Sequence, residues 1–62
     1  MKANEILALR RRMGLSQEKF ARRVGVAFMS VHRWETRKTV PSNLAMERLD
    51  QIARSVDLDA KT

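Results

Sequence analysis

The chain has 62 residues, enough for one domain with a small core and too few for a second domain. It has no cysteine and one histidine, so a disulfide framework, a thiolate metal site and a zinc site made of histidines are excluded. The formal net charge of +6 favours a polyanionic partner, although a solubilising charged surface explains the charge alone equally well.

The positive charge is concentrated in the middle of the chain. Residues 10–38 contain nine Lys or Arg side chains but two carboxylates, Glu18 and Glu35, whereas the segments on either side are close to neutral. This localisation favours nucleic acid as the partner. No apolar stretch is long enough for a membrane span or for the apolar core of a signal peptide, so we expect a cytoplasmic protein.

Four helices are predicted in chain order, which makes the expected fold all-α. In residues 4–13 the apolar side chains recur at helical spacing, and Gly14 supplies a left-handed residue to end that helix. Ser16 is a good N-cap for a second, short helix that ends at Gly25. The side chains expected to form the buried faces of these two helices are Ile6, Leu9, Met13, Phe20, Ala21 and Val24.

The third predicted helix, residues 28–36, has two different faces when its residues are placed 100° apart. One face carries small or apolar side chains and is expected to pack on neighbouring helices; it consists of Ala27, Ser30, Val31 and Trp34. The other face is expected to be exposed, although it includes two large apolar side chains; it consists of Phe28, Met29, His32, Arg33 and Thr36.

A fourth helix is predicted after Pro41, with Ser42 or Asn43 as its N-cap. Its expected inward stripe is Leu44, Leu49, Ile52, Ala53 and Val56. Residues 57–62 are predicted to form a flexible tail, so that residues 1–62 make a single domain.

Residues 17–36 have the features of a helix-turn-helix unit, in which a short turn with glycine joins two helices and the second lies in the major groove of DNA. Ala21 is small enough for the third helix to cross closely, and Gly25 provides the turn. Val31 and Trp34 are expected to hold the second helix of the unit against the first.

Several short motifs occur together at fixed offsets: Gly14-Leu15-Ser16-Gln17, Phe20-Ala21, Val24-Gly25-Val26, Ser30-Val31, and Arg33-Trp34-Glu35 followed by Lys38 and Pro41-Ser42. The combined pattern, over roughly residues 5–56, resembles the XRE type of helix-turn-helix regulators, the class of the lambdoid phage repressor and Cro DNA-binding domains. The resemblance implies a compact four-helix domain, to which many relatives add a fifth helix. It also implies sequence-specific binding of double-stranded DNA and a role in transcription regulation, as a repressor.

The resemblance implies phosphate contacts at both ends of the helix-turn-helix unit. Gln17 looks like the family's phosphate-binding glutamine, with Ser16 and the helix N-terminus beside it. Arg37, Lys38 and Thr39, just beyond the third helix, look like further phosphate contacts. Arg37 stands where relatives usually have glycine in a left-handed turn, so we expect either a different turn or strain of about 1 kcal/mol.

Base contacts are expected from the outward face of the third helix. Arg33 can bond bidentately to guanine, with phosphate contact as its alternative, and His32 can donate to a base or a phosphate. Phe28 and Met29 stand where relatives often have polar base readers. Contact with thymine methyl groups explains their exposure, and so does a protein-protein surface.

Two further features concern stability. Arg10 and Glu35 resemble a pair that in relatives joins the first helix to the third through a partly buried salt bridge. Ala27 stands where relatives have a capping Ser or Thr, so we expect the third helix to be less stable by about 1 kcal/mol.

Two classes of function stay open at this stage. One is a DNA-binding regulator, acting as a homodimer on a two-fold site. The other is a protein-interaction module, such as the antitoxin that binds a toxin, and the two are not exclusive. An enzyme is not expected, because one histidine and scattered carboxylates cannot supply a nucleophile, a base and an orienting group. We also expect no metal and no cofactor.

Overall fold

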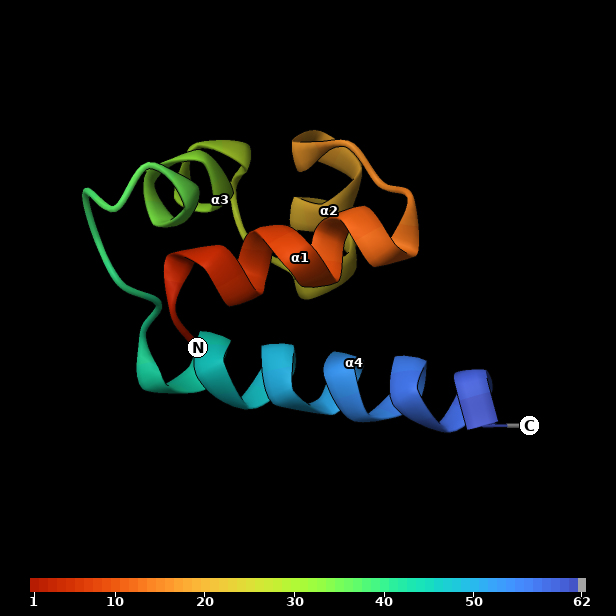
Figure 1. The fold of residues 1–62 in the computed structure, drawn as a ribbon. Helices are drawn as coiled ribbons and strands as arrows, with labels where there is room; N and C mark the ends of the chain where they lie inside the picture. The colour runs from red at the N-terminus through yellow and green to blue at the C-terminus, as the bar shows by residue number, and fades with distance from the viewer. Residues whose placement is uncertain (62) are drawn as a thin grey trace.

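The computed structural model describes residues 1–61, and the side chains of residues 1–57. The described chain folds as four helices without a strand (Figure 1). The helices are α1 (Ala3–Met13), α2 (Gln17–Val24), α3 (Phe28–Glu35) and α4 (Asn43–Lys61). The prediction of an all-α, four-helix domain is confirmed. Thr62, which we placed in the tail, lies outside the described residues.

The helix ends lie where local chemistry places them. Gly14 and Gly25 follow α1 and α2 in the left-handed conformation, with φ of 69° and 87°. The Ser16 hydroxyl accepts a hydrogen bond from the backbone N–H three residues later at 3.2 Å, and Ser42 does the same at 3.3 Å. Both glycine ends and the Ser16 cap are thereby confirmed, and Ser42 is the cap of α4.

A single apolar core joins all four helices. The buried faces predicted for the first two helices are confirmed, except that Met13 is half-buried at the edge of the cluster. On the third helix, Val31 and Trp34 are buried as predicted, whereas Ser30 is half-buried and Ala27 is exposed. Burying the core side chains is the main stabilising contribution in a domain of this size. The core consists of Ile6, Leu9, Phe20, Ala21, Val24, Val31, Trp34, Ala45 and Leu49.

The prediction for the fourth helix was wrong at Leu44. This side chain is 57% exposed, because it lies five positions before the buried Leu49 and hence about 140° away around the helix. Ala45 faces the core in its place and is 4% exposed. The helix also continues to Lys61, so residues 57–61, expected as a tail, form its last turns.

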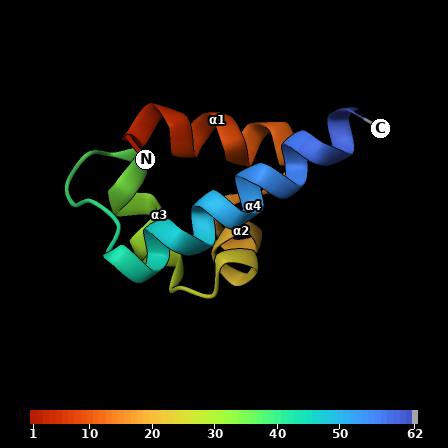
Figure 2. The ribbon, with the colours of Figure 1, turned by 90° about the horizontal axis from the view of Figure 1, so that it is seen from below.

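The helices α2 and α3 lie on one side of the molecule, and α4 runs along the opposite side, against α1 and α2 (Figures 1 and 2). This arrangement leaves the outer surface of α3 uncovered. Over the described residues, no helix has both the length and the apolar character needed to cross a membrane.

Arg48 on α4 fixes the end of α2, a role that the sequence did not reveal. Its guanidinium Nη1 donates to the carbonyls of Val24 at 3.4 Å and Gly25 at 3.3 Å. A Cβ atom at Gly25 would lie 2.8 Å from this nitrogen, in addition to the strain of a positive φ. The hydrogen bonds of Arg48 therefore join the turn between α2 and α3 to α4.

Candidate nucleic-acid interface

The start of α3 follows directly from the turn at Gly25. Ala27 is its N-cap, with extended backbone and no side chain that can accept a hydrogen bond. This confirms the prediction that α3 begins without a capping side chain. Ala27 itself is exposed, in contrast to the inward position that we predicted, because it precedes the first helical turn.

The outward face of α3 is confirmed for its large side chains. Phe28 and Met29 are 45% and 47% exposed, and Arg33 and Thr36 are exposed as well, while His32 is half-buried. The rings of Phe28 and His32 lie against each other, with centroids 6.3 Å apart and planes inclined by 30°. On the opposite face, Val31 and Trp34 are buried and hold the helix in place.

Arg10 and Glu35 form the salt bridge that we expected between α1 and α3. The guanidinium Nε donates to Glu35 Oε2 at 2.7 Å and Nη2 donates to Oε1 at 2.9 Å. The Nη1 of Arg10 also donates to the carbonyl of Leu15 at 3.0 Å. One side chain thus connects α1, the turn before α2, and the end of α3.

The carboxylate of Glu35 stays ionised in its half-buried position. Burial alone would raise the pKa of Glu35, but hydrogen bonds from Arg10 and Gln17 and the charges of Arg10 and Arg11 hold it below its ordinary value. Conversely, the hydrogen bond and the charge of Glu35 raise the pKa of Arg10 although burial opposes this. The pair therefore removes one negative charge from the surface that α3 presents.

Gln17 contributes to this network in a way that we did not foresee. Its amide Nε2 donates to Glu35 Oε1 at 3.0 Å, so the side chain links the first residue of α2 to the last residue of α3. A sequence pattern cannot reveal this contact, since the two residues are 18 positions apart. Its assignment as a phosphate contact, like that of the neighbouring exposed Ser16, stays a prediction.

The loop after α3 resolves the question raised at Arg37. Its φ is 65°, so the turn is left-handed, as in relatives with glycine, and the residue is strained. The backbone N–H of Lys38 donates to the carbonyl of Arg33 at 2.9 Å, which closes the end of the helix. Arg37, Lys38 and Thr39 are all exposed beside the end of α3.

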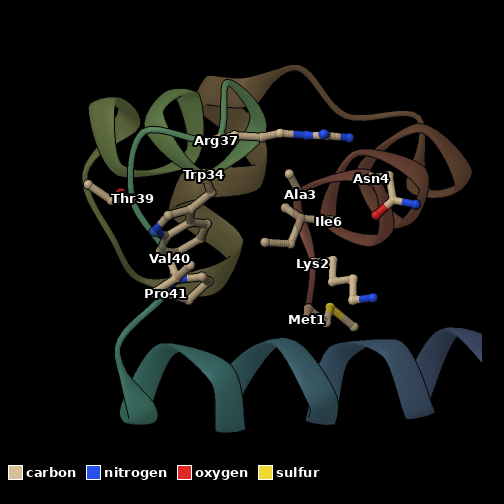
Figure 3. A pocket seen from close by; sticks show the side chains of 10 residues that line it. All are labelled: Met1, Lys2, Ala3, Asn4, Ile6, Trp34, Arg37, Thr39, Val40 and Pro41. Atoms are coloured by element: carbon tan, nitrogen blue, oxygen red, sulfur yellow. The ribbon is translucent and has the colours of Figure 1, made fainter.

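A recess of about 440 Å³ lies between the N-terminal end of α1 and the loop after α3 (Figure 3). The buried Ile6, Trp34 and Pro41 contribute to its apolar lining, and Lys2 and Arg37 are among the polar residues that border it. The sequence did not predict this recess, because residues from two segments far apart in the chain, 1–6 and 34–41, form it.

The surface formed by α3 and the loop after it carries positive charge. The single carboxylate in residues 26–40 is that of Glu35, whose side chain is 6% exposed and bonded to Arg10. Elsewhere, Arg12 pairs with Asp57 at 2.7 Å and Arg22 pairs with Glu18 at 2.9 Å. Among the described residues, Arg33, Arg37 and Lys38 on and beside α3 form no ion pair. An anionic partner would meet cations here without displacing a carboxylate.

The comparison with protein families identifies this arrangement. A family model described as helix-turn-helix matches residues 6–60, nearly the whole chain. Searches of curated proteins and of solved structures give no match. That family is one of DNA-binding regulators and not of enzymes. The chain therefore belongs to the helix-turn-helix family, in the XRE type of the lambda repressor and Cro, as a DNA-binding domain of a transcription regulator.

Proposed function

We propose that this domain binds specific sequences in double-stranded DNA and represses transcription, by inserting the outward face of α3 into the major groove. The observation that carries the proposal is the uncovered face of α3, which joins a base-reading candidate, Arg33, to a cationic loop at its end. In a helix-turn-helix protein, this second helix lies in the groove and its N-terminal residues contact base edges.

Within this proposal the side chains have separate roles. The bases are contacted by Phe28, Met29, His32 and Arg33. Phosphates are contacted by Ser16 and Gln17 at the start of α2 and by Arg37, Lys38 and Thr39 in the loop. Backbone contacts fix the register of the helix on the duplex, and base contacts select the sequence.

The proposed complex is a homodimer on a two-fold site, with half-sites about one helical turn apart. A protein-interaction role, such as that of an antitoxin, is the alternative, because Phe28 and Met29 are exposed apolar side chains. These two roles differ in their dependence on salt, since phosphate contacts release counterions and apolar protein contacts do not.

A salt titration of binding to random duplex DNA tests the proposal. We expect log K to fall linearly with log[salt], with a slope that corresponds to several phosphate contacts. Binding that is undetectable even at ~50 mM salt would contradict DNA binding and favour the protein-partner alternative.

Two matched variants test the division of roles. Arg33→Ala and Lys38→Ala each remove one exposed cation near the same end of α3. Both should weaken binding to random DNA, but Arg33→Ala alone should reduce the preference for specific over random DNA. Equal loss of preference in the two variants would contradict base reading by Arg33.

A further inference from the structure

The N-terminal end of α3 presents an apolar surface, made of exposed apolar side chains, where a groove-binding helix meets base edges. Ala27, Phe28 and Met29 are consecutive and all exposed. The N-cap position has a methyl group and no hydroxyl, so Ala27 offers no hydrogen-bonding group here. The surface is therefore suited to an apolar group on the DNA and not to a hydrogen-bonding edge.

In the major groove, the exposed apolar group of a base pair is the C5-methyl of thymine. The same methyl position is occupied in 5-methylcytosine, whose pairing edge is otherwise that of cytosine. Apolar side chains such as Ala and Phe make this contact in DNA-binding proteins. Cytosine and uracil lack the methyl group and leave the apolar side chains facing water.

The arrangement of α3 also holds these side chains in position. The Phe28 ring is supported by the His32 ring one turn later, with centroids 6.3 Å apart. Met29 lies one turn before Arg33 on the same face of the helix. An apolar side chain is therefore next to a guanidinium that can donate hydrogen bonds to guanine. This pairing matches a methylated pyrimidine next to a guanine.

The surroundings favour DNA over a protein as the occupant of this surface. Arg33, Arg37 and Lys38 are exposed on the same helix and the loop after it. The carboxylate of the same helix, Glu35, is bonded to Arg10 and Gln17. Charge complementarity thus points to a polyanion that carries apolar methyl groups.

From these observations we infer that the domain is a reader of pyrimidine C5-methyl groups, and that it distinguishes 5-methylcytosine from cytosine at the base pair next to Arg33's guanine. The inference rests on the proposed function, because it concerns the same face of α3. Methylation of cytosine at that step would strengthen binding, and loss of a thymine methyl would weaken it.

The test uses the intact chain and a specific site selected from random duplex DNA. Each thymine in that site is replaced singly by deoxyuridine, which removes one methyl group and no charge. At one or two positions we expect about fourfold weaker binding, the effect of one buried methyl-sized group. Replacing the T·A pair there by 5-methylcytosine·G should bind about fourfold more tightly than replacing it by C·G.

Variants assign the effect to the apolar surface. Phe28→Ala or Met29→Ala should abolish the preference for thymine over uracil, and the folded state should survive because neither residue belongs to the core. Leu44→Ala is the matched control, since Leu44 is also a large exposed apolar residue but lies on α4. The Leu44→Ala variant should prefer thymine over uracil as strongly as the unchanged protein does.

Three outcomes would overturn the inference. The first is full-strength specific binding when every thymine is replaced, which leaves the proposed DNA binding intact. The second is a methyl preference that persists in both alanine variants. The third is capture of a protein partner by the apolar surface with no effect of methyl groups on DNA affinity. Absence of binding to any duplex would instead contradict the proposed function itself.

Discussion

At the residue scale, Arg37 combines strain with a charge suited to phosphate. Its φ of 65° is costly for any residue with a Cβ atom. We predict that Arg37→Gly raises the free energy of unfolding by about 1 kcal/mol, as measured by urea denaturation. The chain's single tryptophan, Trp34, is buried in the core and its fluorescence reports the transition.

The same substitution should weaken DNA binding, because it removes a cation next to α3. Arg37→Ala is the control, since it removes the charge but keeps the Cβ atom in the left-handed conformation. We predict that both variants reduce the salt slope by about 1, and that the glycine variant alone gains stability. If the two variants were equally stable, the strain assigned to Arg37 would be refuted.

Glu35 gives the stability a predictable dependence on pH. Its pKa is lower in the folded state than in the unfolded chain, so its contribution is complete above the unfolded value. This contribution to stability is lost as the pH falls below about 4.5, the ordinary pKa of glutamate, and then through the lower pKa that Glu35 has in the folded state. We predict that Glu35→Gln flattens the fall in stability over this range in acid titrations followed by circular dichroism. An unchanged pH profile in the variant would contradict this role.

At the element scale, α3 lacks the side-chain cap that α2 and α4 possess. The Ala27 methyl cannot accept a hydrogen bond, whereas Ser16 and Ser42 do so for their helices. We predict that Ala27→Ser raises the free energy of unfolding by about 1 kcal/mol, because its hydroxyl can accept from a free N–H of the first turn. Ala27→Val, which has no acceptor, should show no such gain in the same denaturation experiment.

The fold could be predicted from the sequence where local chemistry decides it. Gly14, Gly25 and Ser16 mark helix ends through backbone conformation and capping, and the pattern around Phe20 marks the buried face of α2. Leu44 was placed wrongly on the inward stripe, because its angular position, about 140° from Leu49 around the helix, excludes it from the core.

The site could be predicted only in part, because its network depends on tertiary contacts. Periodicity alone identified the outward face of α3, and the resemblance supplied the Arg10–Glu35 pair. The bond from Gln17 to Glu35 and the contact of Arg48 with the end of α2 join residues far apart in the chain. No local pattern encodes these two contacts.

At the scale of the whole molecule, the Arg10–Glu35 pair matters because the domain is small. Breaking a fully buried ion pair by removing one partner costs about 3–5 kcal/mol. This pair is only partly buried, with the Arg10 side chain 17% exposed, so we predict that Arg10→Met lowers the free energy of unfolding by about 2 kcal/mol, a large share for a core of this size. The double variant Arg10→Met with Glu35→Met should recover most of this loss, since apolar replacement of both partners is close to neutral. Urea denaturation followed by Trp34 fluorescence measures both variants, and a double variant less stable than Arg10→Met would contradict this account.

The central claim is that α3 reads specific sequences in duplex DNA, and selection from a random duplex pool tests it most directly. The account predicts enrichment of a short sequence, arranged with two-fold symmetry and half-sites about one helical turn apart. Arg33→Ala should select a site that has lost its preference at one base pair. A pool that shows no enrichment after repeated rounds, with a folded protein, would contradict the claim.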